Sequence, residues 1–462
     1  MVGVGIYYFK KNNSLDDYYV GGRNISYGHI GFSVVATDVG GGFSVGLGGL
    51  GFTMGLSGSW MLFTGLLGAW LSAVFLIPRL FRMSEFRNLF SLPEVFKSLY
   101  GPKAAIIAAL ISFVGYLGFT SSQVLAGAKL ATATISGVSF NNVVIILGVF
   151  TIVYTALGGL KAVIMTDTIQ WIILLFGLIG FGLPFAIYKL GGIELIKSSI
   201  DGAMLSLWNI SWVQMLNWSV TIIPIWFVGM TLYQRIFASK NQAEAQKAWF
   251  LAGLLEWPIM AFVGVALGLL ARVAFVQGLI EFPTAEIDSE MGLPLLLREV
   301  LPAGITGIVL AAYFSAIMST ADSCLMAASG NIVNDLLGKA ISISPKFHIR
   351  LSQIATALIG VIAIMIALKM KSVLELMLLS YGFMVSGLFI PILYAFGNRR
   401  KSQLAAILSM IAGGTTTSIL VYSEYKIWMG LNPNLVGICV SLIVFLVVSL
   451  IDNRNENNKL YR

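Results

Sequence analysis

The sequence predicts an all-α, polytopic membrane protein of about twelve spanning helices, and its composition, hydropathy and charge distribution all indicate this class. Of the 462 residues, 57% are hydrophobic and 11% are charged, and the mean hydropathy is +0.87. A soluble protein carries about 25% charged residues, because its surface must be hydrated. The low charge therefore predicts that much of the surface faces lipid and that residues 1–462 form a single transmembrane domain.

Twelve apolar segments follow one another along the chain, and a segment of about 20 apolar residues is enough to cross about 30 Å of hydrocarbon. These predicted spans, numbered 1 to 12, lie at residues 28–55, 58–78, 104–130, 140–158, 162–188, 211–235, 247–274, 302–330, 350–370, 372–396, 402–422 and 432–451. Residues 1–11 resemble the last two turns of another apolar helix. We therefore expect a truncated leader helix and a cytoplasmic loop within residues 1–25.

Lysine and arginine predict the orientation of the spans. If the loop at 10–25 is cytoplasmic and every segment crosses once, 21 of the 29 basic residues lie on the inner side, as the positive-inside rule requires. The formal net charge of +8 then reflects membrane topology, and no nucleic-acid partner is expected. The two cysteines, Cys324 and Cys439, and the two histidines have no metal-ligand spacing, so we expect neither a disulfide nor a histidine-based metal site.

Span 1 combines an acidic residue with a cluster of glycines. Asp38 is followed by Gly40, Gly41 and Gly42, and four more glycines lie between positions 46 and 51. Each glycine weakens a helix by about 1 kcal/mol relative to alanine. Such a cluster beside an intramembrane acid is typical of a broken helix that lines a binding site. Close helix packing is the alternative, but packing does not explain Asp38.

Three aspartates, Asp38, Asp167 and Asp322, lie deep within predicted spans, whereas Glu256 and Glu375 are weaker candidates, because each can lie near a helix end or pair with a neighbour. A charged side chain at this depth costs at least about 2.5–3.5 kcal/mol, so it should face a cavity or a partner. We expect no lysine or arginine at comparable depth, which leaves a mobile cation as the partner. Carboxylate, hydroxyl and carbonyl oxygens are hard ligands that suit an alkali ion.

Span 8 is too polar to face lipid, and it carries Ala316, Ser319 and Thr320 at positions i, i+3 and i+4. These positions share one face of a helix, so one carbonyl and two hydroxyls can converge there. The alternative is that each hydroxyl bonds back to the carbonyl one turn earlier, and the spacing alone favours this alternative.

Five motifs, in order along nearly the whole chain, resemble those of the sodium:solute symporter family, whose members transport proline, sugars, sialate, choline and related solutes. The motifs are DYYVGGR at 17–23, ATDVGGG at 36–42, GGLKAV at 158–163 with TDTIQ at 166–170, QR at 234–235, and STADS at 319–323 with ND at 334–335. One motif alone would be a weak signal, but five in the family's order are specific.

The resemblance implies a LeuT-type fold, with inverted repeats of five helices at 26–190 and 207–397 and additional C-terminal helices at 400–452. It also implies that sodium is the coupled ion and that it binds between spans 1 and 8. The implied ligands are the carbonyls of Ala36, Val39 and Ala316 and the hydroxyls of Ser319 and Thr320. Asp167 matches an acidic position that forms a second sodium site in some members, and Asp38 matches an aspartate important for sodium-coupled transport in the proline branch.

For the solute, the resemblance argues against two branches of the family. By alignment, Asp38 and Gly229 occupy two aromatic positions of the choline cage, and span 3 has no arginine for a sialate carboxylate. An amino acid or similar zwitterion is therefore favoured over a sugar, an organic acid or a quaternary amine. The residues expected to bind the solute or couple its movement are Asp38, Gly40, Gly41, Phe119, Gln123, Trp226, Tyr233 and Asp322.

The expected mechanism is alternating access in the cell membrane, with a small solute, sodium and the lipid bilayer as partners and the oligomeric state left open. Coupling to protons and a transporter-like sensor are the alternatives. A channel would need a continuous polar pore. An intramembrane enzyme would need a nucleophile–base pair or a metal-binding motif, and the sequence suggests neither within its spans.

Overall fold

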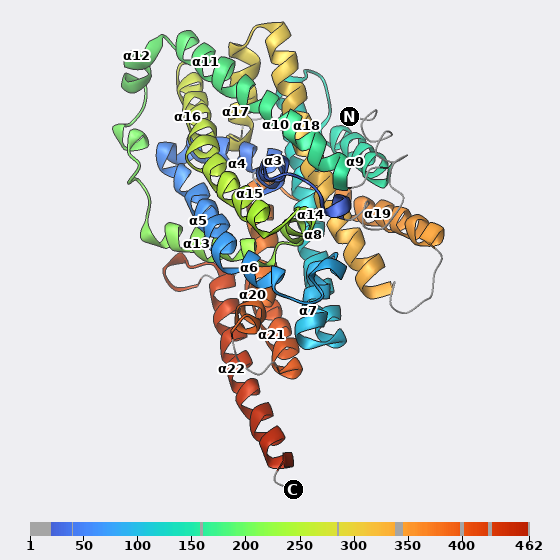
Figure 1. The fold of residues 1–462 in the computed structure, drawn as a ribbon. Helices are drawn as coiled ribbons and strands as arrows, with labels where there is room; N and C mark the ends of the chain where they lie inside the picture. The colour runs from blue at the N-terminus through green and yellow to red at the C-terminus, as the bar shows by residue number, and fades with distance from the viewer. Residues whose placement is uncertain are drawn as a thin grey trace.

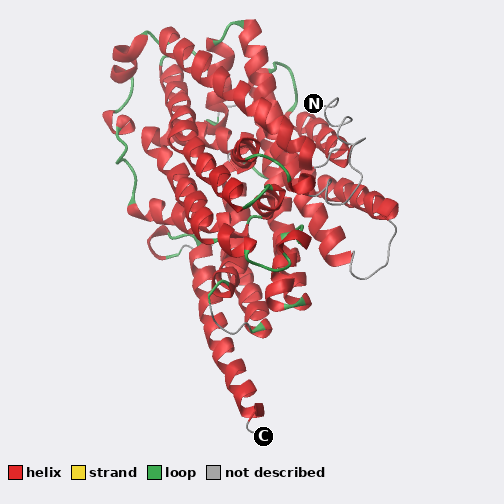
Figure 2. Ribbon diagram, viewed as in Figure 1, coloured by secondary structure: helices red, strands yellow, loops and turns green. Residues whose placement is uncertain are grey.

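The computed structural model describes residues 20–38, 40–157, 160–283, 286–337, 345–397, 402–423 and 427–460. Within these ranges the chain is helical and contains no β-strand element (Figures 1 and 2). The predicted leader-helix remnant at 1–11 lies outside the described residues. The all-α class predicted from the sequence is confirmed.

The elements of the first five predicted spans keep their order along the chain. They are α3 (Tyr27–Asp38) and α4 (Gly40–Met54) for span 1, α5 (Trp60–Phe75) and α6 (Ile77–Phe81) for span 2, α8 (Pro102–Thr134) for span 3, α9 (Phe140–Leu157) for span 4, and α10 (Leu160–Gly177), the π turn η4 (Leu178–Gly182) and α11 (Leu183–Lys189) for span 5. The short helices α7 (Leu92–Tyr100) and α12 (Gly192–Ser198) connect spans.

The remaining spans follow in the same way. They are α13 (Trp212–Val228) and α14 (Met230–Ala238) for span 6, α15 (Gln242–Leu254), the π turn η6 (Leu255–Met260) and α16 (Ala261–Val276) for span 7, α18 (Ala303–Gly330) and the π turn η7 (Asn331–Leu337) for span 8, α19 (Pro345–Ala367), α20 (Val373–Ala395), α21 (Gln403–Tyr422) and α22 (Pro433–Leu460) for spans 9 to 12. Helix α17 (Ser289–Val300) lies between spans 7 and 8.

The count of twelve spans stays a prediction. By length and hydropathy, nine helices in the described part of the chain could cross a membrane, or ten if α13 and α14, which meet at a 43° bend, form one span. The count differs because residues Ser44–Phe81 join two predicted spans into one apolar stretch, and α9 has only a short apolar helix at Phe140–Val153.

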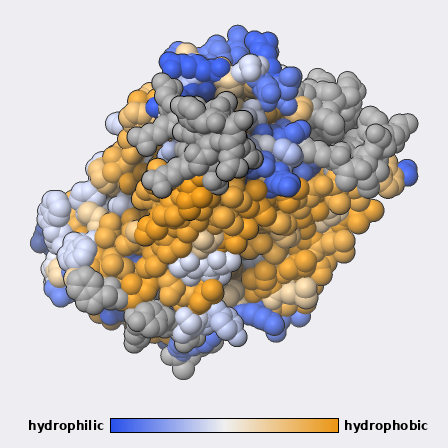
Figure 3. Space-filling model, turned by 90° about the horizontal axis from the view of Figure 1, so that it is seen from below, coloured by the Kyte–Doolittle hydropathy of each residue, from blue (hydrophilic) through white to orange (hydrophobic). Residues whose placement is uncertain are grey.

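The surface carries the apolar side chains expected of a lipid-facing bundle. Figure 3 shows hydrophobic residues covering a broad area, with hydrophilic residues at its margins. Large apolar side chains on separate spans are between 63% and 67% exposed, namely Ile146, Phe176, Leu358, Ile419 and Leu450. In Figure 1, α12 and α17 lie at one end of the molecule and α7 and the C-terminus at the other. These are the ends predicted to face outside and inside.

The glycines of span 1 bring helix backbones into contact. A Cβ at Gly51 would lie 2.2 Å from the Val265 carbonyl oxygen, and one at Gly268 would lie 2.0 Å from the Gly48 carbonyl oxygen. Helices α4 and α16 therefore pack backbone against backbone, as small residues allow in membrane helices. Close packing explains these glycines, but a helix break explains those beside Asp38.

Candidate functional site

The first span is broken where the sequence predicted. Helix α3 ends at Asp38 and α4 begins at Gly40, whose φ of +43° lies in the left-handed region that favours glycine. A Cβ at Gly40 would lie 2.5 Å from Thr320 Oγ1, so the break packs closely against α18. Val39, a predicted sodium ligand, lies outside the described residues. Gly41 follows within the first turn of α4.

Three of the predicted sodium ligands meet across this break. Thr320 Oγ1 lies 2.8 Å from the Ala36 carbonyl oxygen and 3.1 Å from the Ala316 carbonyl oxygen. The bond to Ala316 is the back-bond favoured by spacing alone, and the same hydroxyl also reaches α3. All three residues are buried. The arrangement gathers two carbonyl oxygens and one hydroxyl, which are oxygen ligands suited to an alkali ion.

The fourth described ligand, Ser319, contacts the predicted second sodium position. Its hydroxyl donates a hydrogen bond to Asp167 Oδ1, and Ser33 Oγ donates to Asp167 Oδ2 at 2.5 Å. Asp167 is completely buried on α10. A hydroxyl that donates its hydrogen to a carboxylate leaves its lone pairs for another partner. Asp167 therefore orients the Ser319 oxygen as an acceptor.

The expectation that no basic residue lies at comparable depth is wrong. Arg235 is completely buried, and its Nη2 lies 3.4 Å from Asp167 Oδ2. The predicted span ended at Arg235, but α14 continues to Ala238, and the backbone N–H of Ile25 bonds to the Ala238 carbonyl at 3.2 Å. The segment around Ile25 thus covers this end of α14. A sodium role for Asp167 stays a prediction, because Arg235 already neutralises part of its charge.

Arg235 of α14 also forms hydrogen bonds with side chains of α3 and α18. Its Nε bonds to Ser33 Oγ at 3.0 Å, and its Nη2 bonds to Thr37 Oγ1 at 2.5 Å and to Ser323 Oγ at 3.1 Å. Asp322, the neighbour of Ser323, faces a different helix: Asp322 Oδ1 accepts a 2.5 Å bond from Thr155 on α9. Side chains of the motif at 319–323 thus belong to two separate polar clusters. Ser319 and Ser323 contact the Asp167–Arg235 pair, and Asp322 contacts Thr155.

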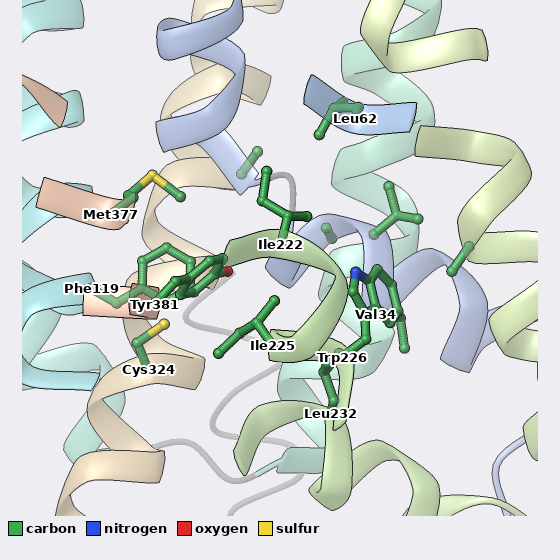
Figure 4. Close-up of a cluster of buried hydrophobic side chains, with 14 of the residues drawn as sticks. Val34, Leu62, Phe119, Ile222, Ile225, Trp226, Leu232, Cys324, Met377 and Tyr381 are labelled. Atoms are coloured by element: carbon green, nitrogen blue, oxygen red, sulfur yellow. The ribbon is translucent and has the colours of Figure 1, made fainter. Parts of the chain in front are cut away.

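Asp38 is brought together with the predicted solute-binding residues of α8. The Tyr381 hydroxyl on α20 donates to Asp38 Oδ1 at 3.0 Å, and the Tyr381 ring meets Phe119 edge-on with centroids 5.0 Å apart. Gln123 Nε2 lies 3.8 Å from Met377 Sδ. Figure 4 shows Phe119, Met377 and Tyr381 close together. No sequence signal distinguished Tyr381, which is one tyrosine within an apolar span.

Trp226 and Tyr233 are not joined to that cluster by their observed contacts. Trp226 packs against Gly68, where a Cβ would lie 2.3 Å from Trp226 Cδ1, and its ring lies 6.4 Å from that of Trp249. In Figure 4, Trp226 lies on the opposite side of Ile225 from Tyr381. The Tyr233 hydroxyl donates to the Phe227 carbonyl within its own span at 2.8 Å.

A cavity of about 490 Å³ lies on the predicted outer side. Its lining includes Gly46 to Met54 of α4, Trp218 of α13 and the outer half of α20 down to Gly382. Gly382 directly follows Tyr381, the partner of Asp38. A Cβ at Gly382 would nevertheless meet Asn434 at 3.2 Å, and the described lining contains none of the predicted sodium or solute residues, so the cavity is separate from the site in this structure.

Glu290, which sequence reasoning missed, closes one wall of this cavity. Its carboxylate accepts bonds from Lys129 Nζ at 2.6 Å and from the backbone N–H groups of Val373 and Leu374 at 2.9 and 3.0 Å. Those N–H groups belong to the first turn of α20, where a negative charge is favourable. Glu290 thus holds α17 against α8 and α20.

Comparison of the sequence with known proteins identifies the family to which the chain belongs. The profile of the sodium:solute symporter family matches residues 18–413. The sodium/proline symporter of Salmonella typhimurium is 28% identical over 98% of this chain and 91% of its own length. The osmoregulated proline transporter OpuE of Bacillus subtilis is 25% identical over 98% of this chain and 93% of its own length. The sodium/pantothenate symporter of Escherichia coli is 24% identical over 96% of this chain and 93% of its own length.

Solved structures show the same fold. A sodium-coupled sialic acid symporter, in a substrate-bound outward-open state, superposes with a TM-score of 0.79 at 21% identity, over 97% of this chain and 95% of that one. A nucleobase-cation-symport-1 family transporter in a closed conformation gives a TM-score of 0.60 at 11% identity, over 96% of this chain and 95% of that one. The fold is thus of the LeuT type. With the family profile matched over most of its length, the chain belongs to the sodium:solute symporter family of cell-membrane transporters and is not an enzyme.

Proposed function

We propose that this protein moves an amino acid or a similar small zwitterion together with sodium, by alternating access around the break between α3 and α4. The carrying observation is the convergence of Ala36, Ala316 and Thr320 oxygens across that break. The names of the relatives support the solute class, because several of them are proline transporters.

Sodium would bind to oxygens that come from two helices. Ala36 lies on α3, and Ala316, Ser319 and Thr320 lie on α18. An ion held by both helices draws them together, and Val39, between the two halves of the broken span, would supply the fifth ligand. Asp167 acts as a positioning residue, since it receives the Ser319 hydrogen and turns the Ser319 lone pairs toward the ion.

The solute would enter through the outer cavity and reach Asp38, Phe119 and Gln123 beside the break. Phe119 and Tyr381 supply aromatic surface there, and the Asp38 carboxylate supplies charge. Ligand sites at broken membrane helices in transporters use exposed backbone groups of the unwound turn in the same way. Gly40 and Gly41 give a solute access to those groups, because they carry no side chains.

Alternating access requires that two parts of the bundle move against each other. The first two spans of the predicted repeat at 26–190 pack against the first two spans of the predicted repeat at 207–397, so the two inverted repeats are interleaved and do not form separate bodies. Glu290 joins the two repeats on the outer side, since it connects Lys129 of the first repeat to the first turn of α20 in the second. Sodium drives transport only if it binds the outward-facing and inward-facing states with different affinities.

The test is the thermal stability of the purified protein in sodium and in potassium at equal ionic strength, with a panel of amino acids, sugars, organic acids and quaternary amines. A ligand that binds only the folded state raises the melting temperature by mass action. An amino acid that stabilises the protein only in sodium supports the proposal. Stabilisation by no solute in sodium would contradict it and favour proton coupling or a sensor.

A further inference from the structure

The outer cavity of about 490 Å³ has the size and lining of a site for a small organic molecule. Its walls are one face of α4, between Gly46 and Met54, one face of α20, between Leu374 and Gly382, and residues of α13 and α21. Ligand pockets have volumes of roughly 300–1,000 Å³ and combine apolar walls with a few polar groups. No residue assigned above to sodium or to the solute lies in the described lining, so an occupant would be bound apart from the break.

One end of the cavity is closed and carries an unsatisfied hydrogen-bond acceptor. Gly382 of α20 and Asn434 of α22 meet there, and both residues are buried. Asn434 Nδ2 bonds to Thr221 Oγ1 at 2.8 Å, whereas Asn434 Oδ1 has no partner among the described residues. A buried amide oxygen without a donor is unfavourable, so the closed end favours a ligand that donates hydrogen bonds.

The charged residues in the described lining are two glutamates, Glu290 and Glu375, and no lysine, arginine or histidine lies among them. Glu290 is neutralised by Lys129, whose Nζ lies 2.6 Å from its carboxylate. Glu375 is exposed in the first turn of α20, two turns before Gly382 or about 10 Å along the helix. Its carboxylate has no hydrogen-bond or ion-pair partner in the described part of the chain, because Ser372 Oγ accepts from its backbone N–H instead. The uncompensated charge of the cavity is therefore negative and attracts a cation.

Apolar side chains line the cavity beside this carboxylate, and they favour an organic cation over a metal ion. Leu50 of α4, Leu378 of α20 and Val421 of α21 contribute to the walls, together with Trp218 of α13. A metal ion gains nothing from such walls, because hard cations are held by several oxygen ligands. An organic ammonium compound fits both features: its charged group can donate charge-assisted hydrogen bonds to Glu375, and its apolar body is removed from water by the walls.

We propose that the outer cavity is a separate binding site for small amphiphilic organic ammonium compounds. The ammonium group pairs with Glu375 at the exposed end, and the apolar body lies between Leu50, Leu378 and Val421. An occupant contacts α4, α20 and α21 at once, so it holds the outer half of the broken span in place and opposes closure of the outer side. The site is thus inhibitory, and the binding itself does not depend on which solute or ion the protein carries.

The experiment uses three probes that share a phenyl ring and a two-carbon linker but differ in the head group: phenethylamine, phenethyl alcohol and hydrocinnamate. Each probe is titrated against the purified full chain, in potassium and again in sodium, with the melting temperature as readout. The protonated amine should stabilise the protein at lower concentration than the alcohol, the carboxylate should bind most weakly, and the two salts should give the same half-saturating concentration. Equal stabilisation by the three probes would overturn the ligand class, and stabilisation by none would overturn the site.

Variants then locate the bound probe. Glu375→Gln should raise the half-saturating concentration of phenethylamine about two- to fivefold, as expected for an exposed ion pair, and leave that of phenethyl alcohol unchanged. The exposed control Glu194→Gln should change neither. Leu378→Trp fills the cavity and should abolish stabilisation by phenethylamine, and Val421→Trp fills it from the facing wall if the first variant does not purify as a folded protein. Binding that persists in the filled cavity, or that is lost in Phe119→Ala but kept in Glu375→Gln, would overturn the proposal.

Discussion

Thr320 offers the sharpest perturbation of the sodium site. Its Oγ1 lies 2.8 Å from the Ala36 carbonyl oxygen, and its methyl group packs on the break, since Cγ2 would lie 3.0 Å from a Cβ at Gly40. Thr320→Ala removes both the oxygen and the methyl group, whereas Thr320→Ser removes the methyl group alone. The difference between the two variants therefore isolates the hydroxyl.

The expected magnitude follows from the bond that is lost. Hydrogen bonds to charged groups contribute about 1.5–3 kcal/mol, and contact between an ion and a hydroxyl oxygen is of the same electrostatic kind. Since about 1.4 kcal/mol is a factor of ten, Thr320→Ala should raise the half-saturating sodium concentration about ten- to hundredfold. Thr320→Ser should raise it no more than about fourfold, because the loss of a methyl group costs about 0.8 kcal/mol.

The assay is a sodium titration of the melting temperature, repeated with sodium-driven uptake in reconstituted vesicles. Both readouts should shift together for Thr320→Ala. Equal sodium requirements in the alanine variant and the wild type would refute the placement of sodium at this hydroxyl. Equal shifts in the alanine and serine variants would mean that packing against Gly40, and not ligation, determines the effect.

Three further predictions follow from the polar contacts around the break. Arg235→Gln should destabilise the protein by about 3–5 kcal/mol by leaving Asp167 unpaired, and adding Asp167→Asn should restore most of the melting temperature; a double variant as unstable as the single one would contradict the pairing. Tyr381→Phe should weaken solute binding severalfold by removing the bond to Asp38, with little change in solute-free melting temperature; unchanged solute affinity would separate Asp38 from binding. Glu290→Gln should speed the labelling of a cysteine placed at Leu378 by a water-soluble maleimide, because the outer wall loosens; unchanged labelling would exclude this role.

Much of the fold was predictable because membrane helices are specified by local composition. Apolar length located the spans, and the cluster after Asp38 located the break, since glycine tolerates the φ of +43° found at Gly40. The convergence of Ala316 and Thr320 also follows from helix periodicity. The family resemblance alone predicted that Ala36 on α3 completes the site with Thr320. No local pattern in one sequence pairs residues that are 284 positions apart.

The unpredicted features depend on contacts between distant segments. Arg235 was placed at a helix end, and its burial arises from α3, α10 and α18, whose polar side chains surround the guanidinium. The roles of Tyr381 and Glu290 arise from single hydrogen bonds that connect α20 to α3 and to α17, which hydropathy cannot predict. Trp226 was expected beside Phe119, but the direction of its ring depends on the space left by Gly68.

The most direct test of sodium coupling is uptake into reconstituted vesicles with the membrane potential clamped, using the solute that best stabilises the protein. One set of vesicles carries an inward sodium gradient at equal pH, and a second carries an inward proton gradient in potassium without sodium. Coupling at the break between α3 and α4 predicts accumulation in the first set only, reduced in Thr320→Ala unless sodium is raised. Accumulation in the second set, or equal uptake in both, would contradict it.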